Sequence, residues 1–402
     1  MSLPSWTVRS VREVDEHLII EAEIDEMPLA CPLCGSTRPP YRFGYRLRTL
    51  FDLPIRMKPV QLVARRHRFR CKDCGDTFLD ATPALSQEHD ATERLVSYIE
   101  THALQLTCTF TSLAVALGVS EKFVRTVFAA HIDRLERDYA IQTPRYLGID
   151  EIYIEDAPYC VLTDLERRCT LDLLPKRDMV SVKRWLTGLD SPHTIEAVAM
   201  DLWNPYRLAV REVLPQAVIV ADKYHVLRLA NDVVETVRKS IRATLTPAQQ
   251  KRLKQNRKIL LKRERDLTPH QRLVLESWTG FVPVLSELHR LKEEFFRIYD
   301  AGCEQDAYER YLTWQQQIPP SLFEAFLSLQ LTLEEWGEEV FAYFRIDAPL
   351  TNAFTERANL TIREAARVTF GLTFRTLRAK LLFYPSNLAA RTRKTGDLQP
   401  SG

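Results

Sequence analysis

The chain has 402 residues, which is too many for one ordinary hydrophobic core and enough for two to four domains. Its 45% hydrophobic and 27% charged residues predict a mainly globular protein. No apolar run reaches the roughly 18 residues that span a bilayer, and the N-terminus has no basic segment followed by an apolar one. We therefore expect a cytoplasmic protein with no membrane partner.

Positive charge is concentrated in two segments, although the net charge is only +2. Residues 31–80 hold eleven Lys and Arg against four Asp and Glu, and residues 238–266 hold eleven against two. Such an excess favours a polyphosphate partner, because each contacted phosphate releases condensed counterions. For either segment alone, solvated surface charge explains the composition equally well.

Residues 1–86 are predicted to form short strands and turns that hold two Cys-x-x-Cys pairs. Each pair offers two thiolates from one turn, and a glycine follows it, where a positive φ is useful. Because a reducing cytosol disfavours disulfides, we predict one structural zinc with four thiolate ligands. These ligands are Cys31, Cys34, Cys71 and Cys74. We expect the other cysteines in the core: Cys108, Cys160, Cys169 and Cys303.

The arginine-rich stretch 65–70 continues an alternating apolar stretch, 60–64, and leads directly into the second cysteine pair. We expect the two stretches to form one half-exposed strand that presents basic side chains to DNA phosphates. These are Arg65, Arg66, Arg68 and Arg70.

Residues 90–140 change to a helical period and include a predicted helix-turn-helix. Gly118 would lie in the turn, and Ser120 would cap a recognition helix that runs to about Phe128. That helix would expose Lys122 and Arg125 to a major groove, together with Glu121 and Thr126. Helical hairpins of this shape also occur in cores without nucleic acid, but the basic cysteine module beside this one favours DNA binding.

Residues 144–225 alternate strands with helices, which predicts one α/β sheet. We expect strands at 146–150, 159–164, 170–174, 195–200 and 217–221, and helices at 182–189 and 205–214. Asp150 and Asp201 each follow an apolar strand, at the sheet edge where ligands bind. Two such carboxylates stay ionised together only if a cation lies between them, and two Mg²⁺ ions would suit phosphoryl transfer.

A third acid for such a site is Glu356. Asn352, Glu356, Asn359 and Arg363 recur at spacings of four, three and four, so they share one helical face. By pattern alone, a solvent-facing polar stripe is the commoner explanation of that face.

Residues 226–345 carry almost no strand signal and are predicted to be helical. Trp278, Trp314 and Trp336 lie within them. Buried packing is the commoner role of such residues, and stacking on a flipped base is the alternative. The tail from Arg391 onward is predicted to be disordered.

Taken together, these features resemble the ISL3 family of bacterial insertion-sequence transposases along nearly the whole chain. The resemblance rests on the paired cysteines, the run 65–71, the helix-turn-helix, Gly148-Ile149-Asp150-Glu151, Asp201 with Tyr206, Pro215 and Ala217, Asp222-Lys223-Tyr224-His225-Val226, and Thr351-Asn352-Ala353-Phe354-Thr355-Glu356. Their order and spacing are specific as a set.

The resemblance implies a multidomain α+β protein with a ribonuclease-H-like α/β catalytic core interrupted by an all-helical insertion. Asp150, Asp201 and Glu356 would be the catalytic DDE triad that binds two Mg²⁺ or Mn²⁺ ions. In such a core the first three strands form a meander and the fourth adjoins the first, so 195–200 would bring Asp201 beside Asp150. The strand at 217–221 would then lie one place further out, with Asp222 at the rim of the site, orienting His225.

The domains implied are a zinc-ribbon-like DNA-binding module at 1–86, a helix-turn-helix at 87–140, core segments at 141–235 and 346–390, a helical insertion at 236–345 and a basic tail at 391–402. The basic helices after Glu356 add further candidate DNA contacts, which include Arg363 and Arg367.

The function implied is binding of terminal inverted repeats, followed by DNA cleavage and strand transfer by a nucleoid-associated homodimer or larger oligomer. The alternatives are a domesticated, non-catalytic DNA-binding regulator and a nuclease of the same fold without joining activity.

Overall fold

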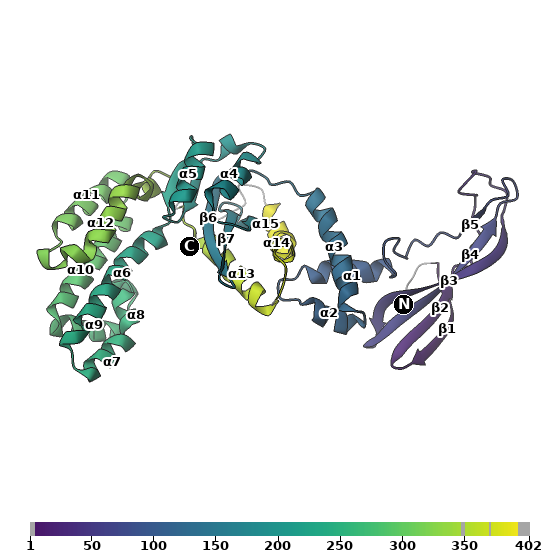
Figure 1. Ribbon diagram of the computed structural model, residues 1–402, viewed down its shortest axis with the longest axis horizontal. Helices are drawn as coiled ribbons and strands as arrows, with labels where there is room; N and C mark the ends of the chain where they lie inside the picture. Colours follow the sequence, from purple (N-terminus) through teal and green to yellow (C-terminus); the bar gives the residue numbers. More distant parts are fainter. Residues whose placement is uncertain (1–4, 347–349, 370, 393–402) are drawn as a thin grey trace. The chain divides into compact units, whose positions relative to one another are not determined.

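The computed structural model describes residues 5–346, 350–369 and 371–392. The chain forms two compact units: Met1–Ala140 with Arg363–Leu388, and Ile141–Ile362 with Ala389–Gly402. Figure 1 labels their helices and strands. Within the described ranges, no helix combines the length and apolar character needed to cross a membrane. The predicted basic tail lies, from residue 393 on, outside the described residues.

The first unit begins with a five-stranded sheet in the order β1-β2-β4-β3, and β5 pairs with β4. Its strands are β1 (Thr7–Val14), β2 (His17–Glu23), β3 (Tyr41–Ile55), β4 (Lys58–Arg70) and β5 (Thr77–Leu79). The prediction of short strands is wrong for β3 and β4, which have 15 and 13 residues. Two-residue turns with positive φ, Asp15–Glu16 and Arg56–Met57, close the β1–β2 and β3–β4 hairpins, since this backbone twist matches that of antiparallel strands.

Strand β4 changes its buried face half-way along its length. Val60, Leu62 and Ala64 are buried in its first half, whereas His67 and Phe69 are buried in its second. The first half packs in the core of the sheet, and the second half, paired with β5, leads into Cys71. The predicted continuous strand over 60–70 is confirmed.

The helical part of the first unit has one hydrophobic core. It comprises α1 (Glu93–Ala103), α2 (Phe110–Leu117), α3 (Glu121–Arg137) and α14 (Phe374–Phe383). Gly118 turns the chain between α2 and α3 with a φ of 67°, and the Ser120 hydroxyl accepts a hydrogen bond from the Phe123 amide at 3.2 Å. Helix α3 therefore begins where predicted but continues well beyond Phe128.

Helix α14 belongs with these helices rather than with the second sheet. Leu382 and Phe383 lie in their core, and the Lys380 ammonium donates hydrogen bonds to the carbonyl oxygens of Gln105 (3.0 Å) and Cys108 (2.7 Å). The sequence assigns all of 346–390 to the catalytic core, but residues 363–388 group with the first unit because α14 is apolar on the face that covers α1–α3.

The second unit contains a five-stranded sheet in the order β10-β9-β6-β7-β8. The strands are β6 (Tyr146–Ile154), β7 (Ala157–Asp164), β8 (Cys169–Leu174), β9 (Ala197–Met200) and β10 (Val218–Ala221). Strands β6, β7 and β8 form an antiparallel meander, while β9 is parallel to both β6 and β10. This is the predicted strand order, with β9 beside β6 and β10 one place further out.

Helices cover both faces of this sheet. On one face, Ile149 and Met200 pack against α4 (Met179–Thr187) and α5 (Asn204–Val213). The alternate residue Gly148 faces α13 (Ala353–Val368), with Thr355 above it. Asp150 lies two residues beyond Gly148 and so shares the face that α13 covers.

Residues 223–346, all of which the structure describes, contain helices and no strand. They are α6 (Lys223–Ser240), α7 (Pro247–Gln255), α8 (Arg257–Leu261), α9 (Pro269–Phe281), α10 (Pro283–Arg297), α11 (Glu304–Gln316) and α12 (Pro320–Phe341), with short 3₁₀ turns between some of them. Trp278, Trp314 and Trp336 are at most 8% exposed in their common core. Their burial supports the packing role over stacking on a base.

Gly148 allows α13 to approach the sheet. A Cβ atom at this position would lie 2.4 Å from Thr163 Oγ1 and 2.5 Å from Thr355 Oγ1, far inside van der Waals contact. These two hydroxyls hydrogen-bond each other at 2.6 Å, so neither can move without breaking that bond. Only glycine fits between β7 and α13 at this point of β6.

We predict that Gly148→Ala lowers the free energy of unfolding by about 1–3 kcal/mol, because overpacking displaces α13. The matched control is Gly280→Ala in α9, where a Cβ atom meets nothing within 4 Å. Removal of a helical glycine should stabilise the protein by about 0.5–1 kcal/mol. Urea unfolding midpoints of both variants test this, and equal shifts would contradict it.

Candidate functional site

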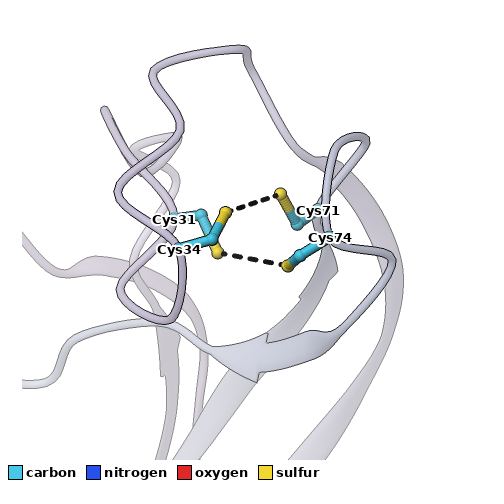
Figure 2. A group of neighbouring side chains, drawn as sticks. All are labelled: Cys31, Cys34, Cys71 and Cys74. Atoms are coloured by element: carbon cyan, nitrogen blue, oxygen red, sulfur yellow. Dashed lines mark hydrogen bonds between the residues drawn. The ribbon is translucent and has the colours of Figure 1, made fainter.

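The four paired cysteines converge at one end of the first sheet. Figure 2 shows their side chains facing one another from two turns. The Sγ atoms of Cys31 and Cys74 are 3.9 Å apart, and those of Cys34 and Cys71 are 3.7 Å apart. A tetrahedral zinc with bonds of about 2.3 Å separates its sulfur ligands by about 3.8 Å. The four thiols therefore fit one zinc, and they leave no position for substrate.

The two turns have the same backbone geometry. The amide of Cys31 donates to the Ser36 carbonyl oxygen at 2.8 Å, and that of Cys71 donates to the Asp76 carbonyl oxygen at 2.9 Å. Gly35 and Gly75 have φ angles of 73° and 77°, the region that glycine adopts without strain. The two glycines therefore let each turn fold back behind its pair of thiols.

The thiols need a cation in order to ionise together. Backbone N–H groups of Cys74 and Asp73 lower the pKa of Cys71 to about 7. The backbone N–H of Asp76 lowers the pKa of Cys74, but burial and the neighbouring thiols outweigh it and raise this pKa to about 12. Zinc would replace the protons that the cluster otherwise shares.

The four scattered cysteines are only partly as predicted. Cys160 and Cys169 are buried in the second sheet, but Cys108 is half-buried and Cys303 is exposed. The prediction of a core position is wrong for Cys303, which precedes α11 at the surface.

In the second unit, Asp150 and Asp201 meet on neighbouring parallel strands. Strand β6 carries Asp150 and lies beside β9, which ends immediately before Asp201. Both side chains are buried, with 4% and 8% exposure. Together with His225 they offer ligand atoms within 4.8 Å of one another. Residues that lie 51 positions apart in the sequence thus form one buried acidic pair.

His225 connects this pair to two more acids. Its Nδ1 donates a hydrogen bond to Asp222 Oδ2 at 3.0 Å and lies 2.9 Å from Asp201 Oδ1. His225 also forms a second group with Asp222 and Glu356, again with ligand atoms within 4.8 Å. The site therefore has four carboxyl groups arranged around one imidazole.

Asp222 differs from its predicted place at the rim. Its side chain is fully buried, because it caps α6: Oδ2 accepts from the His225 amide at 3.3 Å, and Oδ1 accepts from the Asn352 amide at 3.1 Å. The expected contact with His225 is present. With both oxygens occupied by donors, Asp222 is less available to a metal than Asp201.

One oxygen of Asp201 is buried without a hydrogen bond. No donor meets Oδ1 in hydrogen-bonding geometry, although His225 Nδ1, which is bonded to Asp222 Oδ2, lies 2.9 Å away. A buried carboxylate oxygen without a donor is costly unless a cation binds it. Together with the oxygens of Asp150, it provides the hard donor set that Mg²⁺ and Mn²⁺ prefer, so the residues present fit a divalent cation.

Burial and mutual repulsion shift the acids strongly. Burial, followed by the charge of Asp201, raises the pKa of Asp150 to about 9. Burial also raises the pKa of Glu356, and the charge of Asp222 adds to this. Burial lowers the pKa of His225, but Asp201 and Asp222 outweigh it and raise it to about 10. Such shifts are typical of carboxylate clusters that bind cations.

The polar stripe of α13 is buried, not solvent-facing. The side-chain amide of Asn359 donates to Asp150 Oδ2 at 2.7 Å, and the side-chain amide of Asn352 donates to the Ile149 carbonyl oxygen at 3.1 Å. Glu356 is half-buried between them, whereas Arg363 is exposed. The solvent-facing explanation is therefore wrong for all but the end of the stripe.

Comparison with known proteins agrees with this geometry. A family model described as a transposase, of the ISL3 group of DDE transposases, matches residues 147–381, more than half of the chain. The chain belongs to the ISL3 family of transposases. A second model, the zinc finger of the transposases of IS204, IS1001, IS1096 and IS1165, matches residues 28–74.

Two named transposases are similar along most of the chain. The transposase for insertion sequence element IS1001 of Bordetella parapertussis is 24% identical over 350 residues, 85% of each chain. The transposase for insertion sequence element IS1557 of Mycobacterium tuberculosis is 24% identical over 390 residues, 89% of this chain and 85% of that one. The zinc finger and the transposase domain of this ISL3 member are thus both shared with relatives.

The predicted DNA-contacting residues of the transposase lie at or near its surface. The β4 arginines also have internal partners: Arg66 donates to the Asp80 carbonyl oxygen at 2.6 Å, and Arg70 to that of Gly75 at 2.9 Å. On α3, Lys122 and Arg125 are exposed, and Arg125 also pairs with Glu121. The remaining ones are Arg65, Arg68, Ser120, Arg363 and Arg367, of which the last three are exposed.

Sequence reasoning missed the residues that anchor α13. Thr163 and Thr355 form a buried hydroxyl pair, and Asn352 Oδ1 accepts from Thr355 at 2.8 Å. The available signal was the apolar environment of Gly148, a glycine inside a strand, which often marks a close approach of another segment.

We predict about one zinc per chain and its loss in Cys34→Ser, because three thiolates hold zinc more weakly than four. Hydrogen exchange should rise over residues 31–38 and 71–79, while the second unit stays protected. The matched control is Cys303→Ser, an exposed cysteine outside the cluster. Zinc at full stoichiometry in Cys34→Ser would contradict the site.

We predict that Mn²⁺ stabilises the protein more as the pH rises from 6 to 9. Because the folded state holds the proton of Asp150 more tightly than the unfolded chain does, this proton stabilises the metal-free protein at low pH. That contribution is lost as the pH rises through about 9, whereas the cation competes with the proton and binds better.

The increase should reach about 1–3 kcal/mol at saturating Mn²⁺, measured as thermal shifts, and should vanish in Asp150→Asn. The control variant is Asp156→Asn, an exposed acid in the adjoining turn. A shift independent of pH, or one retained in Asp150→Asn, would contradict the proposed cation site.

Proposed function

We propose that this protein binds the terminal inverted repeats of its insertion sequence and catalyses metal-dependent cleavage and strand transfer of DNA by a DDE mechanism. The observation that carries the proposal is the buried Asp150–Asp201 pair, in which Asp150 lies in the middle of β6 and Asp201 lies just past the end of the parallel strand β9. A transposase domain needs such a pair because hard cations must be held where phosphate oxygens react.

In this proposal, Asp150, Asp201 and Glu356 hold two Mg²⁺ or Mn²⁺ ions. Cations bound there would activate a water or a 3′-hydroxyl and stabilise the leaving oxygen. Asn359 orients Asp150 through the 2.7 Å hydrogen bond to Oδ2, and the Glu151 backbone amide donates to Oδ1 at 2.7 Å, so both contacts fix the carboxylate beside Asp201. Asp222 and the protonated His225 hold Asp201 in place and offset part of its charge.

We further propose that residues 141–235 and the start of α13 form a ribonuclease-H-like core into which the helices after α6 are inserted. The strand order β10-β9-β6-β7-β8, with three antiparallel strands followed by two parallel ones, supports this assignment. The helices of residues 223–346, which follow β10 and contain no strand, support an insertion.

DNA ends are proposed to contact the first unit. The exposed Lys122 and Arg125 near the start of α3 are suited to read bases in a major groove, and the β4 arginines to hold phosphates. The active form is proposed to be at least a dimer, because two transposon ends must be joined in one complex.

A domesticated, non-catalytic regulator is not favoured. A regulator has no need for buried carboxyl groups that raise one another's pKa, and such a cluster lowers the stability of a protein that binds no cation. Detection of strand-transfer products would exclude the other alternative, a nuclease without joining activity.

We predict that Asp201→Asn abolishes Mg²⁺-dependent nicking of the terminal repeat and strand transfer while DNA binding is retained. Asp222→Asn should lower activity less, because its oxygens already accept hydrogen bonds from backbone amides. Cleavage gels and gel-shift assays on the same DNA measure both. Full activity of Asp201→Asn, or equal loss in both variants with intact folding, would overturn the assignment.

A further inference from the structure

A groove of about 510 Å³ lies within the second unit, and its lining includes Trp203, two residues after Asp201. Its walls come from the start of β7, the connection from β8 to α4 and the connection from β9 to α5. Its lining includes the aromatic side chain of Trp203 and the cations Lys176 and Arg177. The volume is that of a small-molecule site, and the walls are mainly apolar.

Trp203 is held in this groove by the segment that carries Asp201. Its amide donates to the Asp201 carbonyl oxygen at 2.7 Å, and its own carbonyl oxygen accepts from the Tyr206 amide at 3.0 Å as α5 begins. The indole nevertheless stays 38% exposed, although Tyr206 three residues later is buried. A large aromatic side chain that is fixed by its backbone but left open to solvent is typical of a binding surface.

Two cations border the same groove. The Arg177 guanidinium lies 4.5 Å from the centre of the Trp203 ring and 5.7 Å from that of Tyr153. It also pairs with Glu151, the residue after Asp150 on β6. Lys176 is exposed at the groove edge. An aromatic, apolar surface beside two cations matches a nucleobase with its phosphate, whereas an apolar peptide would not require the cations.

We propose that this groove binds one unpaired nucleotide of the DNA substrate next to the cleavage position, with its base stacked on Trp203 and its phosphate near Lys176 and Arg177. The inference rests on the proposed function, since it assigns the groove to the DNA that the acids cut. Its physical role is to keep one nucleotide out of the duplex, so that the neighbouring phosphate reaches Asp150 and Asp201.

The test uses the full-length protein and duplex terminal repeats carrying 5-iodouracil at successive positions around the cleavage position. Irradiation should cross-link one or two adjacent positions to Trp203, identified by mass spectrometry, in the non-cleaving Asp150→Asn variant as well. Trp203→Ala should lose this cross-link and cleave about 5- to 150-fold more slowly, the range expected for loss of one base stack. Trp203→Phe should retain most of the activity.

The control is Phe323→Ala, which removes a more exposed aromatic side chain from α12, outside the groove. An abasic site at the cross-linked position should reduce the defect of Trp203→Ala, because no base then has to leave the stack. The inference is overturned if Trp203→Ala, with unchanged melting, cleaves like wild type or if no position cross-links to Trp203. It is also overturned if the variant changes only the oligomeric state, which would assign the groove to a protein partner.

Failure of wild-type protein to cleave any terminal repeat would instead count against the proposed function. Cross-linking in Asp150→Asn needs no cleavage, so it still decides the assignment of the groove.

Discussion

The candidate active site depends on the close packing of α13 against β6. Asn352 and Asn359 reach the backbone of Ile149 and the side chain of Asp150 across more than 200 positions of sequence. Gly148 provides the space for this approach, and the Thr163–Thr355 hydrogen bond fixes its depth. Because Glu356 lies on the same helix face, its distance from the two aspartates is determined by the polar contacts of its neighbours Asn352, Thr355 and Asn359.

Electrostatics explain why this arrangement requires a ligand. Four carboxyl groups surround a single imidazole, and burial withholds the water that would screen them. Protons can neutralise the cluster, and the raised pKa of Asp150 reflects this. A divalent cation neutralises two carboxylates at once. The cysteine cluster of the first unit follows the same logic with softer ligands, since its thiols also cannot all ionise without a metal.

The sequence predicted the parts of the fold that depend on local patterns. Cysteine spacing was sufficient for the zinc site, because two Cys-x-x-Cys turns have few other uses. Apolar strands followed by acids indicated Asp150 and Asp201, but the predicted strand end at Asp150 is wrong, since β6 continues to Ile154. The buried face of α13 could not be predicted, since a stripe of Asn and Glu at helical spacing has the same composition as a solvated surface. The position of α14 with the first unit and the burial of Asp222 likewise depend on contacts between distant segments.

The groove at Trp203 shows a further limit of sequence patterns. Nothing in Asp201-Leu202-Trp203 indicates that the indole stays exposed, because exposure is decided by the turn into α5 and by Arg177 from another connection. The relatives share about a quarter of their residues with this chain, which supports the transposase domain but does not assign single side chains.

The most direct test of the account is a crystal structure of the protein with Mn²⁺ and its terminal-repeat DNA, in which anomalous scattering locates the metal. We predict that Mn²⁺ binds between Asp150 and Asp201, that Glu356 completes the site, and that Asp222 still caps α6. Mn²⁺ bound between Asp150 and Asp222, with Asp201 remote from it, would contradict the account.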